Sequence, residues 1–349
     1  MNDMNPSRSK TRKKTPYGEL KALVRDAGLL AKQPWYYAWR VPVTFLMPVP
    51  ALLAIIYIDN IWWHVVAGAY MGVAYNQLVF IGHDALHHQI FGDRRDLRLA
   101  LFMLPFMGLS QSWWAYTHNR HHGRPNEKDF DPSIGFNYLA FSESEALAKV
   151  GFARTAVKYQ GYYFLILMIL YPVLMKISSF THLVRTWNRQ RVAEMGAFLL
   201  HFPLYIWFVF TYLEPTNAIV FIALHQSVFG LCLFSVFGPN HIGQVVLPRG
   251  HSYDYLEQQA ITSQNVQAGV LTDFWFGGLN HQIEHHLFPT VPRNRLKLVR
   301  PIVKEYCQRH GIPYYESSAP RCYLEILQYM HRSSEALRRE QTQALEKLL

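Results

Sequence analysis

The sequence has only three cysteines, Cys232, Cys307 and Cys322, and none of them belongs to a CxxC pair. Their spacing argues against a zinc ribbon and against a disulfide framework. Charged residues are also scarce, at 17% of the 349 residues, whereas 50% are apolar and 15% are aromatic. A soluble domain usually carries about 25% charged residues. The composition therefore favours a membrane protein. The first 40 residues lack the apolar core of a secretory signal peptide.

Long stretches of the chain are almost free of charge. A spanning helix needs about 20 predominantly apolar residues. Four stretches predict spanning helices, at about 42–58, 61–82, 196–213 and 217–238. Two further apolar stretches, 97–114 and 161–175, need a separate decision because each separates groups of histidines.

The chain has a net charge of +10, but its basic residues lie at the ends of these apolar stretches, so the charge does not indicate a nucleic-acid partner. Lys and Arg precede the first span, lie between later ones and follow the last. The short connections 59–60 and 214–217 contain neither residue. The positive-inside rule puts these two loops outside and places the N-terminus, the C-terminus and the histidine-rich segments in the cytoplasm. The basic N-terminal leader is expected to touch anionic lipid headgroups.

Seventeen histidines are present, and most of the informative ones come in three groups. The groups are GHDALHH at 82–88, THNRHH at 117–122 and NHQIEHH at 280–286. On an α-helix, residues i, i+3 and i+4 share one face. These spacings aim several side chains of each group at one point. The side chains are His83 and His87; His118, His121 and His122; and Gln282, His285 and His286.

Seven histidines at these spacings exceed the four to six ligands that one transition metal takes, so two metals are predicted. Imidazole suits iron, copper, zinc and nickel alike. Polar groups beside hydrocarbon are usually functional, and a site at the membrane face has access to a lipidic substrate. An alkyl C–H bond does not yield to acid–base chemistry, so such a site needs an oxidising metal and O2. Iron is then favoured.

Three segments carry a resemblance to a known family: GHDALHHQIF (82–91), SWWAYTHNRHHGRPNEKDFDPSI (112–134) and FGGLNHQIEHHLFPTVPRNRL (276–296). They resemble the HxxxH, HxxHH and QxxHH boxes of membrane fatty acid desaturases. The third is similar to that of the front-end subgroup, whose last box begins with glutamine. The resemblance extends over roughly residues 40–310 and rests on three boxes in order, which is far more specific than a single HxxHH.

The resemblance implies ligands for two iron ions at His83, His87, His118, His121, His122, His285 and His286. Gln282 stands where many relatives have a histidine, and we expect it to be a further metal ligand. The family also takes a ligand from the end of its last span, where this chain has His241, and Asn240 beside it could hold a water. Four acidic neighbours could accept the distal N–H of a ligand imidazole, namely Asp84, Glu284, Asp129 and Asp131. Of these we expect Asp84 to do so. His88, one residue beyond the face of His83 and His87, is expected to support ligands rather than to bind metal.

The resemblance also implies an O2-dependent fatty acyl desaturase that acts on an acyl chain of a lipid or an acyl thioester. The sequence contains no GxGxxG, no iron–sulfur cysteine set and no HPGG heme segment. Two electrons are therefore expected from an external donor, either ferredoxin or cytochrome b5 with its reductase. A hydroxylase, ketolase or alkane monooxygenase with the same metal site remains an alternative. A heme-binding or metal-transporting membrane protein fits less well, because the histidines gather at one face.

If 97–114 or 161–175 crossed the membrane once, the histidine groups on its two sides would lie on opposite faces. We therefore expect both stretches to lie along or dip into the cytoplasmic leaflet. Hydropathy alone would instead make 161–175 a fifth span.

The predicted fold is an all-α integral membrane protein with four transmembrane helices in two hairpins, membrane-peripheral helices and a cytoplasmic helical cap that holds a histidine-rich di-metal site. The predicted parts are a leader at 1–40, a membrane domain at 41–310 and a helical tail at 311–349. Amphipathic helices are expected at 294–308 and 319–348.

Overall fold

The computed structural model of the protein describes residues 15–346. Residues 1–14 of the predicted leader and residues 347–349 of the predicted tail lie outside this part. Within it the fold is mostly helical with almost no strand, which confirms the all-α part of the prediction. The strands of the described part are β1 (Asn265–Val266) and β2 (Glu316–Ser317), which pair in parallel.

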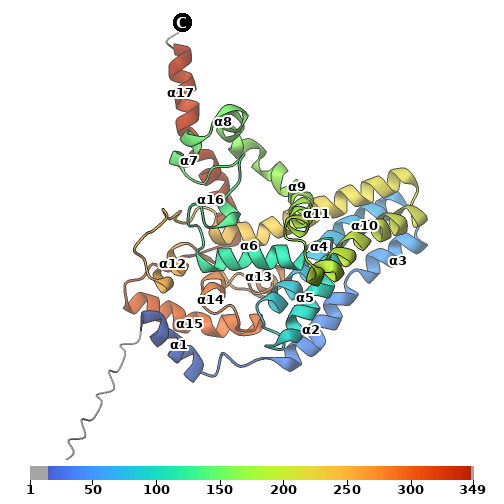
Figure 1. The fold of residues 1–349 in the computed structure, drawn as a ribbon, viewed down its shortest axis with the longest axis horizontal. Helices are drawn as coiled ribbons and strands as arrows, with labels where there is room; N and C mark the ends of the chain where they lie inside the picture. Colours follow the sequence, from blue (N-terminus) through green and yellow to red (C-terminus); the bar gives the residue numbers. More distant parts are fainter. Residues whose placement is uncertain (1–14, 347–349) are drawn as a thin grey trace, which may run out of the picture.

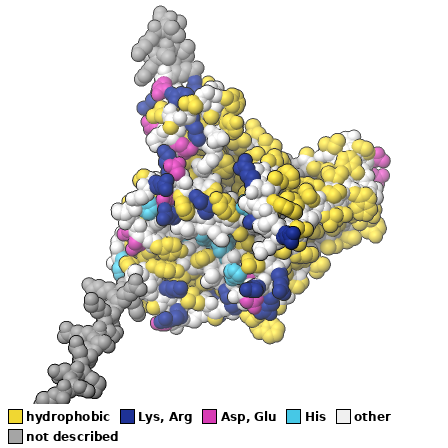
Figure 2. Space-filling view, viewed as in Figure 1, with side chains coloured by type: hydrophobic (Ala, Val, Ile, Leu, Met, Phe, Trp, Pro, Cys, Tyr) yellow, Lys and Arg dark blue, Asp and Glu magenta, His cyan; other side chains and the backbone are white. Residues whose placement is uncertain are grey.

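Two helical hairpins form an elongated bundle whose far end lies at the right of Figure 1. The first hairpin consists of α2 (Pro34–Leu46), α3 (Val49–Tyr57) and α4 (Ile61–Leu86), and the second of α10 (Val192–Tyr212) and α11 (Pro215–His241). Figure 2 shows that apolar side chains cover this lobe and that acidic side chains gather at its tip. The hairpins contain the four stretches predicted as spans. The first of these, 42–58, begins inside α2 and is divided between α2 and α3.

Glycines let α4 and α11 pack closely. A Cβ at Gly72 would lie 2.8 Å from the Phe229 nitrogen and 2.9 Å from the His225 carbonyl oxygen. Small residues at such crossings allow helix backbones to approach each other in membranes. The close packing aligns the ends of α4 and α11, which carry His83 and His241.

The helix α9 (Gln160–Arg185) is also long and apolar enough to cross a membrane, so five helices of the described chain meet that criterion. It runs steeply across the bundle in Figure 1 and crosses α11 where a Cβ at Gly230 would lie 2.3 Å from the Met168 carbonyl oxygen. At its start, the Gln160 side chain donates to the Ala140 carbonyl, and near its end Ser179 accepts from the Ser110 amide. Both ends of α9 therefore contact segments that flank the second histidine box.

The remaining helices lie outside the two hairpins. They are α1 (Pro16–Asp26), α5 (Arg94–Phe106), α6 (Gln111–Gly123), η1 (Pro132–Ile134), α7 (Glu143–Ala148), α8 (Gly151–Lys158), η2 (Arg189–Arg191), α12 (Tyr255–Ile261), α13 (Val270–Trp275), α14 (Gln282–Leu287), α15 (Arg293–Arg309), α16 (Ala319–Arg332) and α17 (Glu335–Glu346). Among them, α7, α8 and α17 project upward in Figure 1.

Two expected helical stretches are interrupted. The apolar stretch 97–114 divides at Gly108, whose φ of +72° belongs to the left-handed region that favours glycine. The expected helix 319–348 divides at residues 333–334, where the Ser333 hydroxyl accepts a hydrogen bond from Gln160 at 2.7 Å. The expected helix 294–308 forms as α15 with one extra residue at each end.

Candidate metal centre

Four helices bring the predicted ligands together at one end of the bundle. His83 lies in the last turn of α4, and His241 is the last residue of α11. The second box lies on α6, whose start is capped by the Ser110 hydroxyl, and the third box lies on α14. The second and third boxes lie within helices, and the first runs from the last turn of α4 to its C-cap, His87. The i, i+3 and i+4 side chains of each box therefore point to one side.

Five histidines form one group, in which one ring nitrogen of each lies within 4.8 Å of the others. The Nε2 atom of His118 lies 2.8 Å from that of His87 and 3.1 Å from that of His122. The Nε2 atoms of His122 and His285 are 3.2 Å apart. His83 completes this five-histidine group, with its ring centroid 4.8 Å from that of His285.

The other three predicted histidines form a second group. The Nε2 atoms of His121 and His241 are 3.2 Å apart, and the ring centroids of His241 and His286 are 4.7 Å apart. The two groups touch through His122 and His286, whose rings stack at 4.2 Å. All eight predicted histidines therefore lie in two adjacent groups.

Hydrogen bonds determine the tautomers of the three-histidine group. Nδ1 of His241 lies 3.0 Å from the Thr262 carbonyl oxygen, which can only accept. Nδ1 of His121 faces the Asp131 carboxylate at 2.8 Å, and Nδ1 of His286 faces Oε1 of Gln259 at 2.8 Å. Each Nδ1 therefore carries the hydrogen, and each Nε2 directs a lone pair into the group. Lone pairs that converge in this way can bind a cation.

The five-histidine group fits a metal for a related reason. Both ring nitrogens of His83 are buried without a hydrogen-bond partner among the described residues. Such groups are rare in folded proteins unless a ligand, an ion or a water satisfies them.

Burial keeps these imidazoles in the form that binds metal. It lowers the pKa of His87 to about 3. The pKa values of His118, His122, His285 and His286 are also lowered, first by burial and then by the neighbouring imidazoles. A metal ligand must be neutral imidazole. These imidazoles are therefore neutral at pH 7 and able to bind a cation.

Gln282 lies beside the three-histidine group but turns its nitrogen toward it. Its Nε2 is 2.9 Å from Nε2 of His241, and its Oε1 accepts from Nδ2 of Asn240 at 3.1 Å. The Asn240 amide is itself oriented, because its Nδ2 also donates to the carbonyls of Val236 and Leu279. Asn240 thus holds the Gln282 carboxamide in place.

Asp84 and His88, expected as partners of ligand imidazoles, have other contacts. Asp84 accepts hydrogen bonds from Arg293 and, at 2.9 Å, from Tyr37. Its Oδ1 is 3.7 Å from Nδ1 of His83, which is longer than a hydrogen bond. The His88 side chain is 42% exposed and its Nδ1 faces the Asp93 carbonyl. The backbone turns at His88, with φ +55°, so its ring leaves the face of His83 and His87.

Asp131 is the carboxylate that orients a histidine of the site. In addition to His121 it accepts from the amide of Asn126 at 2.8 Å and from the Ser133 hydroxyl at 2.5 Å. Burial opposes its charge, but the bonds from His121 and Ser133 leave the pKa of Asp131 below its usual value. Gln259 and Thr262 have comparable roles. Sequence reasoning missed these two, because isolated polar residues in a connecting segment carry no pattern.

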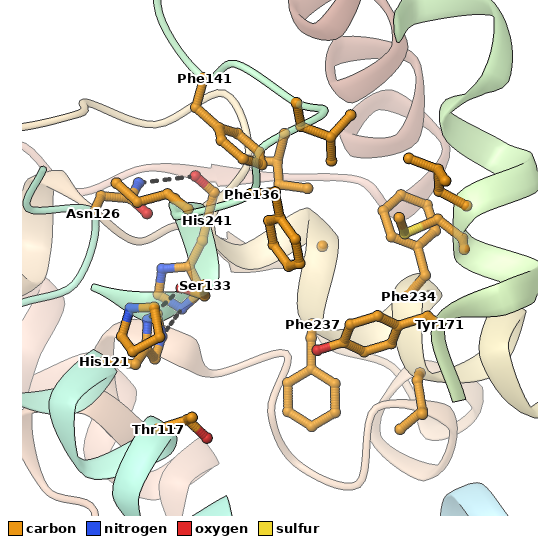
Figure 3. A pocket seen from close by; sticks show the side chains of 18 of the residues that line it. Thr117, His121, Asn126, Ser133, Phe136, Phe141, Tyr171, Phe234, Phe237 and His241 are labelled. Atoms are coloured by element: carbon orange, nitrogen blue, oxygen red, sulfur yellow. Dashed lines mark hydrogen bonds between the residues drawn. The ribbon is translucent and has the colours of Figure 1, made fainter. Parts of the chain in front are cut away.

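A cavity of about 410 Å³ opens beside the histidines. Figure 3 shows His121 and His241 on one side and Phe234, Phe237 and Tyr171 on the other. One face of α9 lines it with residues spaced three or four apart. These are Phe164, Leu167, Met168, Tyr171, Leu174, Met175 and Ser178. At 1.5 Å per residue this face is about 21 Å long. The cavity is therefore elongated and mainly apolar, with histidine side chains of both groups in its wall.

Comparisons with known proteins agree with this geometry. The profile of the fatty acid desaturase family matches residues 60–318. A Delta(8)-fatty-acid desaturase of Euglena gracilis is 27% identical over 87% of this chain and 75% of its own length. An acyl-lipid (9-3)-desaturase of Physcomitrium patens is 28% identical over 92% of this chain and 63% of its own length. A Delta(5) fatty acid desaturase of Caenorhabditis elegans is 26% identical over 85% of this chain and 69% of its own length.

Proposed function

Because the chain belongs to the fatty acid desaturase family and is a membrane fatty acid desaturase, we propose that its two histidine groups hold two iron ions. His83, His87, His118, His122 and His285 would hold one ion, and His121, His241 and His286 the other. Gln282, held by Asn240, would border the second ion. The observation that carries this proposal is the convergence of eight imidazoles at the wall of an apolar cavity.

Bound iron supplies the O2-dependent oxidation that side chains alone cannot perform. Overall, –CH2–CH2– + O2 + 2 electrons + 2 protons gives –CH=CH– + 2 H2O. The electrons come from an external donor, either ferredoxin or cytochrome b5 with its reductase, since the sequence has no nucleotide, heme or iron–sulfur motif of its own. The acyl chain belongs to a lipid or an acyl thioester.

The protein places the substrate. An acyl chain offers many nearly identical CH2 groups, so the cavity must hold one pair of carbons next to the histidines. The long face of α9 provides an apolar wall, and Phe234 and Phe237 of α11 face it across the cavity. Asp131, Thr262 and Gln259 keep the ligand imidazoles oriented.

Product analysis tests the function. The chain is expressed with a working electron donor in a host with a defined lipid pool, and the lipids are analysed by mass spectrometry. The expected product has lost two hydrogens. A product that has instead gained one oxygen would favour the hydroxylase alternative, which shares the metal site.

Filling the cavity should block desaturation without removing iron. Met168→Trp adds an aromatic ring on the face of α9 that lines the cavity, and overpacking of this kind is poorly tolerated. We expect desaturation to fall at least about tenfold, whereas iron content stays at the wild-type level. Leu170→Trp is the matched control, because Leu170 lies on the same helix but is 49% exposed and does not line the cavity. Equal activity of both variants would show that the acyl chain does not bind in this cavity.

We also propose that the two hairpins cross the membrane, with the metal centre and both termini on the cytoplasmic side, and that α9 dips into the cytoplasmic leaflet. An exposed apolar surface supports this placement, because Val150, Phe152 and Tyr162 are 80%, 77% and 69% exposed. Figure 2 shows apolar side chains along the upward projection, where α7, α8 and α17 lie in Figure 1, and on toward the bundle. Basic residues lie on both sides of the apolar stretch 161–175 of α9, as expected of a segment anchored at one leaflet. They are Arg154, Lys158 and Arg185.

Cysteine labelling distinguishes this topology from a fifth span. The three native cysteines are buried, so labelling of a variant with one added cysteine reports the position of that cysteine. Ser144→Cys and Gln190→Cys, exposed positions on either side of α9, should react with a membrane-impermeant maleimide from the same side of sealed vesicles. Thr216→Cys, in the outer turn, should react from the other side. Labelling of positions 144 and 190 from opposite sides would show that α9 crosses the membrane.

A further inference from the structure

The two histidine groups differ in what holds their outer nitrogens. In the three-histidine group every Nδ1 has an oxygen acceptor, from Asp131, Thr262 or Gln259. In the five-histidine group the Nδ1 atoms of His83, His122 and His285 have no partner among the described residues. Hydrogen bonds to the outer nitrogen fix the tautomer and ring orientation of a ligand histidine. The smaller group therefore has fewer ligands but is the better oriented.

One short helix, α12, contributes two of these three acceptors. Gln259 lies on it, and Thr262 directly follows its last residue. A capping box of Asp254 and Glu257 stabilises its start. Leu256 and Ala260 are fully buried and pack in the same core as Ile283 of α14. The position of α12 against the third box is therefore set by packing.

Gln259 joins the second box to the third. Its side chain is fully buried, and its Nε2 donates to the backbone carbonyl of His122 at 3.0 Å. That contact orients the carboxamide, so Oε1 must face Nδ1 of His286, at 2.8 Å. One amide thus contacts the backbone of a residue in the five-histidine group and the side chain of a residue in the three-histidine group.

We propose that Gln259 is a positioning residue for the metal centre. It holds His286 in the tautomer whose Nε2 lone pair faces His121 and His241, and it fixes the position of α14 relative to α6. This inference rests on the proposed binding of two iron ions. Its consequence is selective, since loss of the Gln259 acceptor should weaken the ion at the three-histidine group and leave the other ion bound.

The experiment compares three full-length variants with wild type in metal content and metal affinity, without reference to turnover. Gln259→Leu removes both hydrogen bonds. Gln259→Glu keeps an acceptor for His286 but no longer donates to His122. Gln258→Leu is the matched control, because Gln258 is a neighbouring buried glutamine of α12 whose Nε2 has no hydrogen-bond partner among the described residues. Iron per chain is measured by elemental analysis, affinity by competition with a chelator, and site identity by Mössbauer spectroscopy.

We expect Gln259→Leu to lose one of two iron signals and to bind that ion about 10- to 100-fold more weakly, the usual effect of removing such a partner. Gln259→Glu and Gln258→Leu should keep both ions. If Gln259 served only to pack the core, Gln259→Glu should lose iron as well, because a buried carboxylate would disturb the core. If Gln259→Leu does not fold, Gln259→Met makes the same deletion with a closer shape.

The possible failures are distinguishable. Wild type without bound iron would overturn the proposed function and this inference with it. Wild type with two ions and an unchanged Gln259→Leu variant would overturn this inference alone. So would loss of both ions from Gln259→Leu, or a Gln259→Glu variant that loses as much iron as the leucine variant.

Discussion

Replacing His285 by alanine is expected to abolish new double bonds, with product falling at least about 100-fold and iron lost from the five-histidine group. His285 is central to that group, since its ring centroid lies 4.8 Å from those of His83 and His122 and 4.9 Å from that of His87. Removing an outer partner of a ligand already costs about 10- to 100-fold in affinity or activity. Removing a ligand should cost more. Lipid mass spectrometry and elemental analysis measure the two effects.

His88→Asn is the control for this prediction. His88 belongs to the first box but lies outside both groups, and its φ of +55° is one that asparagine tolerates. The variant should keep wild-type product and iron content. New double bonds in the His285→Ala strain, or no product from wild type despite good expression and a working donor, would count heavily against the proposed function.

Replacing Asp84 by leucine is expected to lower the free energy of unfolding by about 3–5 kcal/mol. Asp84 and Arg293 form an ion pair whose side chains are only 3% and 4% exposed. Without the carboxylate the guanidinium would be buried with no opposite charge beside it, which is the costly case. The pair also ties the start of α15 to the end of α4, and so the third box to the first. Thermal unfolding in detergent measures the loss.

A double variant separates the ion pair from simple packing. Asp84→Leu with Arg293→Met replaces both charges by apolar groups, and such replacements are often neutral or stabilising. We expect it to recover most of the stability that Asp84→Leu loses. An exposed ion pair serves as the comparison, since Arg309 and Glu305 are 63% and 66% exposed. Glu305→Ala should lower the free energy of unfolding by no more than about 1 kcal/mol. A double variant as unstable as the sum of its single variants would contradict the prediction.

Local patterns predicted the helices well. The apolar stretches 61–82 and 217–238 correspond to α4 (Ile61–Leu86) and α11 (Pro215–His241), and both helices continue a turn or less beyond the apolar residues to carry His83 and His241. Hydropathy ends where polar residues begin, whereas the helix ends where its backbone hydrogen bonds end. For the same reason hydropathy could not show that Gly108 and residues 333–334 interrupt helices.

The histidine spacing by itself determined which side chains share a helix face, because that depends only on the 3.6-residue turn. How the helices dock was decided by tertiary packing. Packing divided eight histidines into groups of five and three. It placed Asp131 rather than Asp84 within hydrogen-bond distance of a histidine of these groups, and it brought Gln259 to His286. A single hydrogen bond between residues far apart in the chain depends on the relative position of two helices to within less than an ångström. No local pattern of residues contains that position, so only the folded chain determines it.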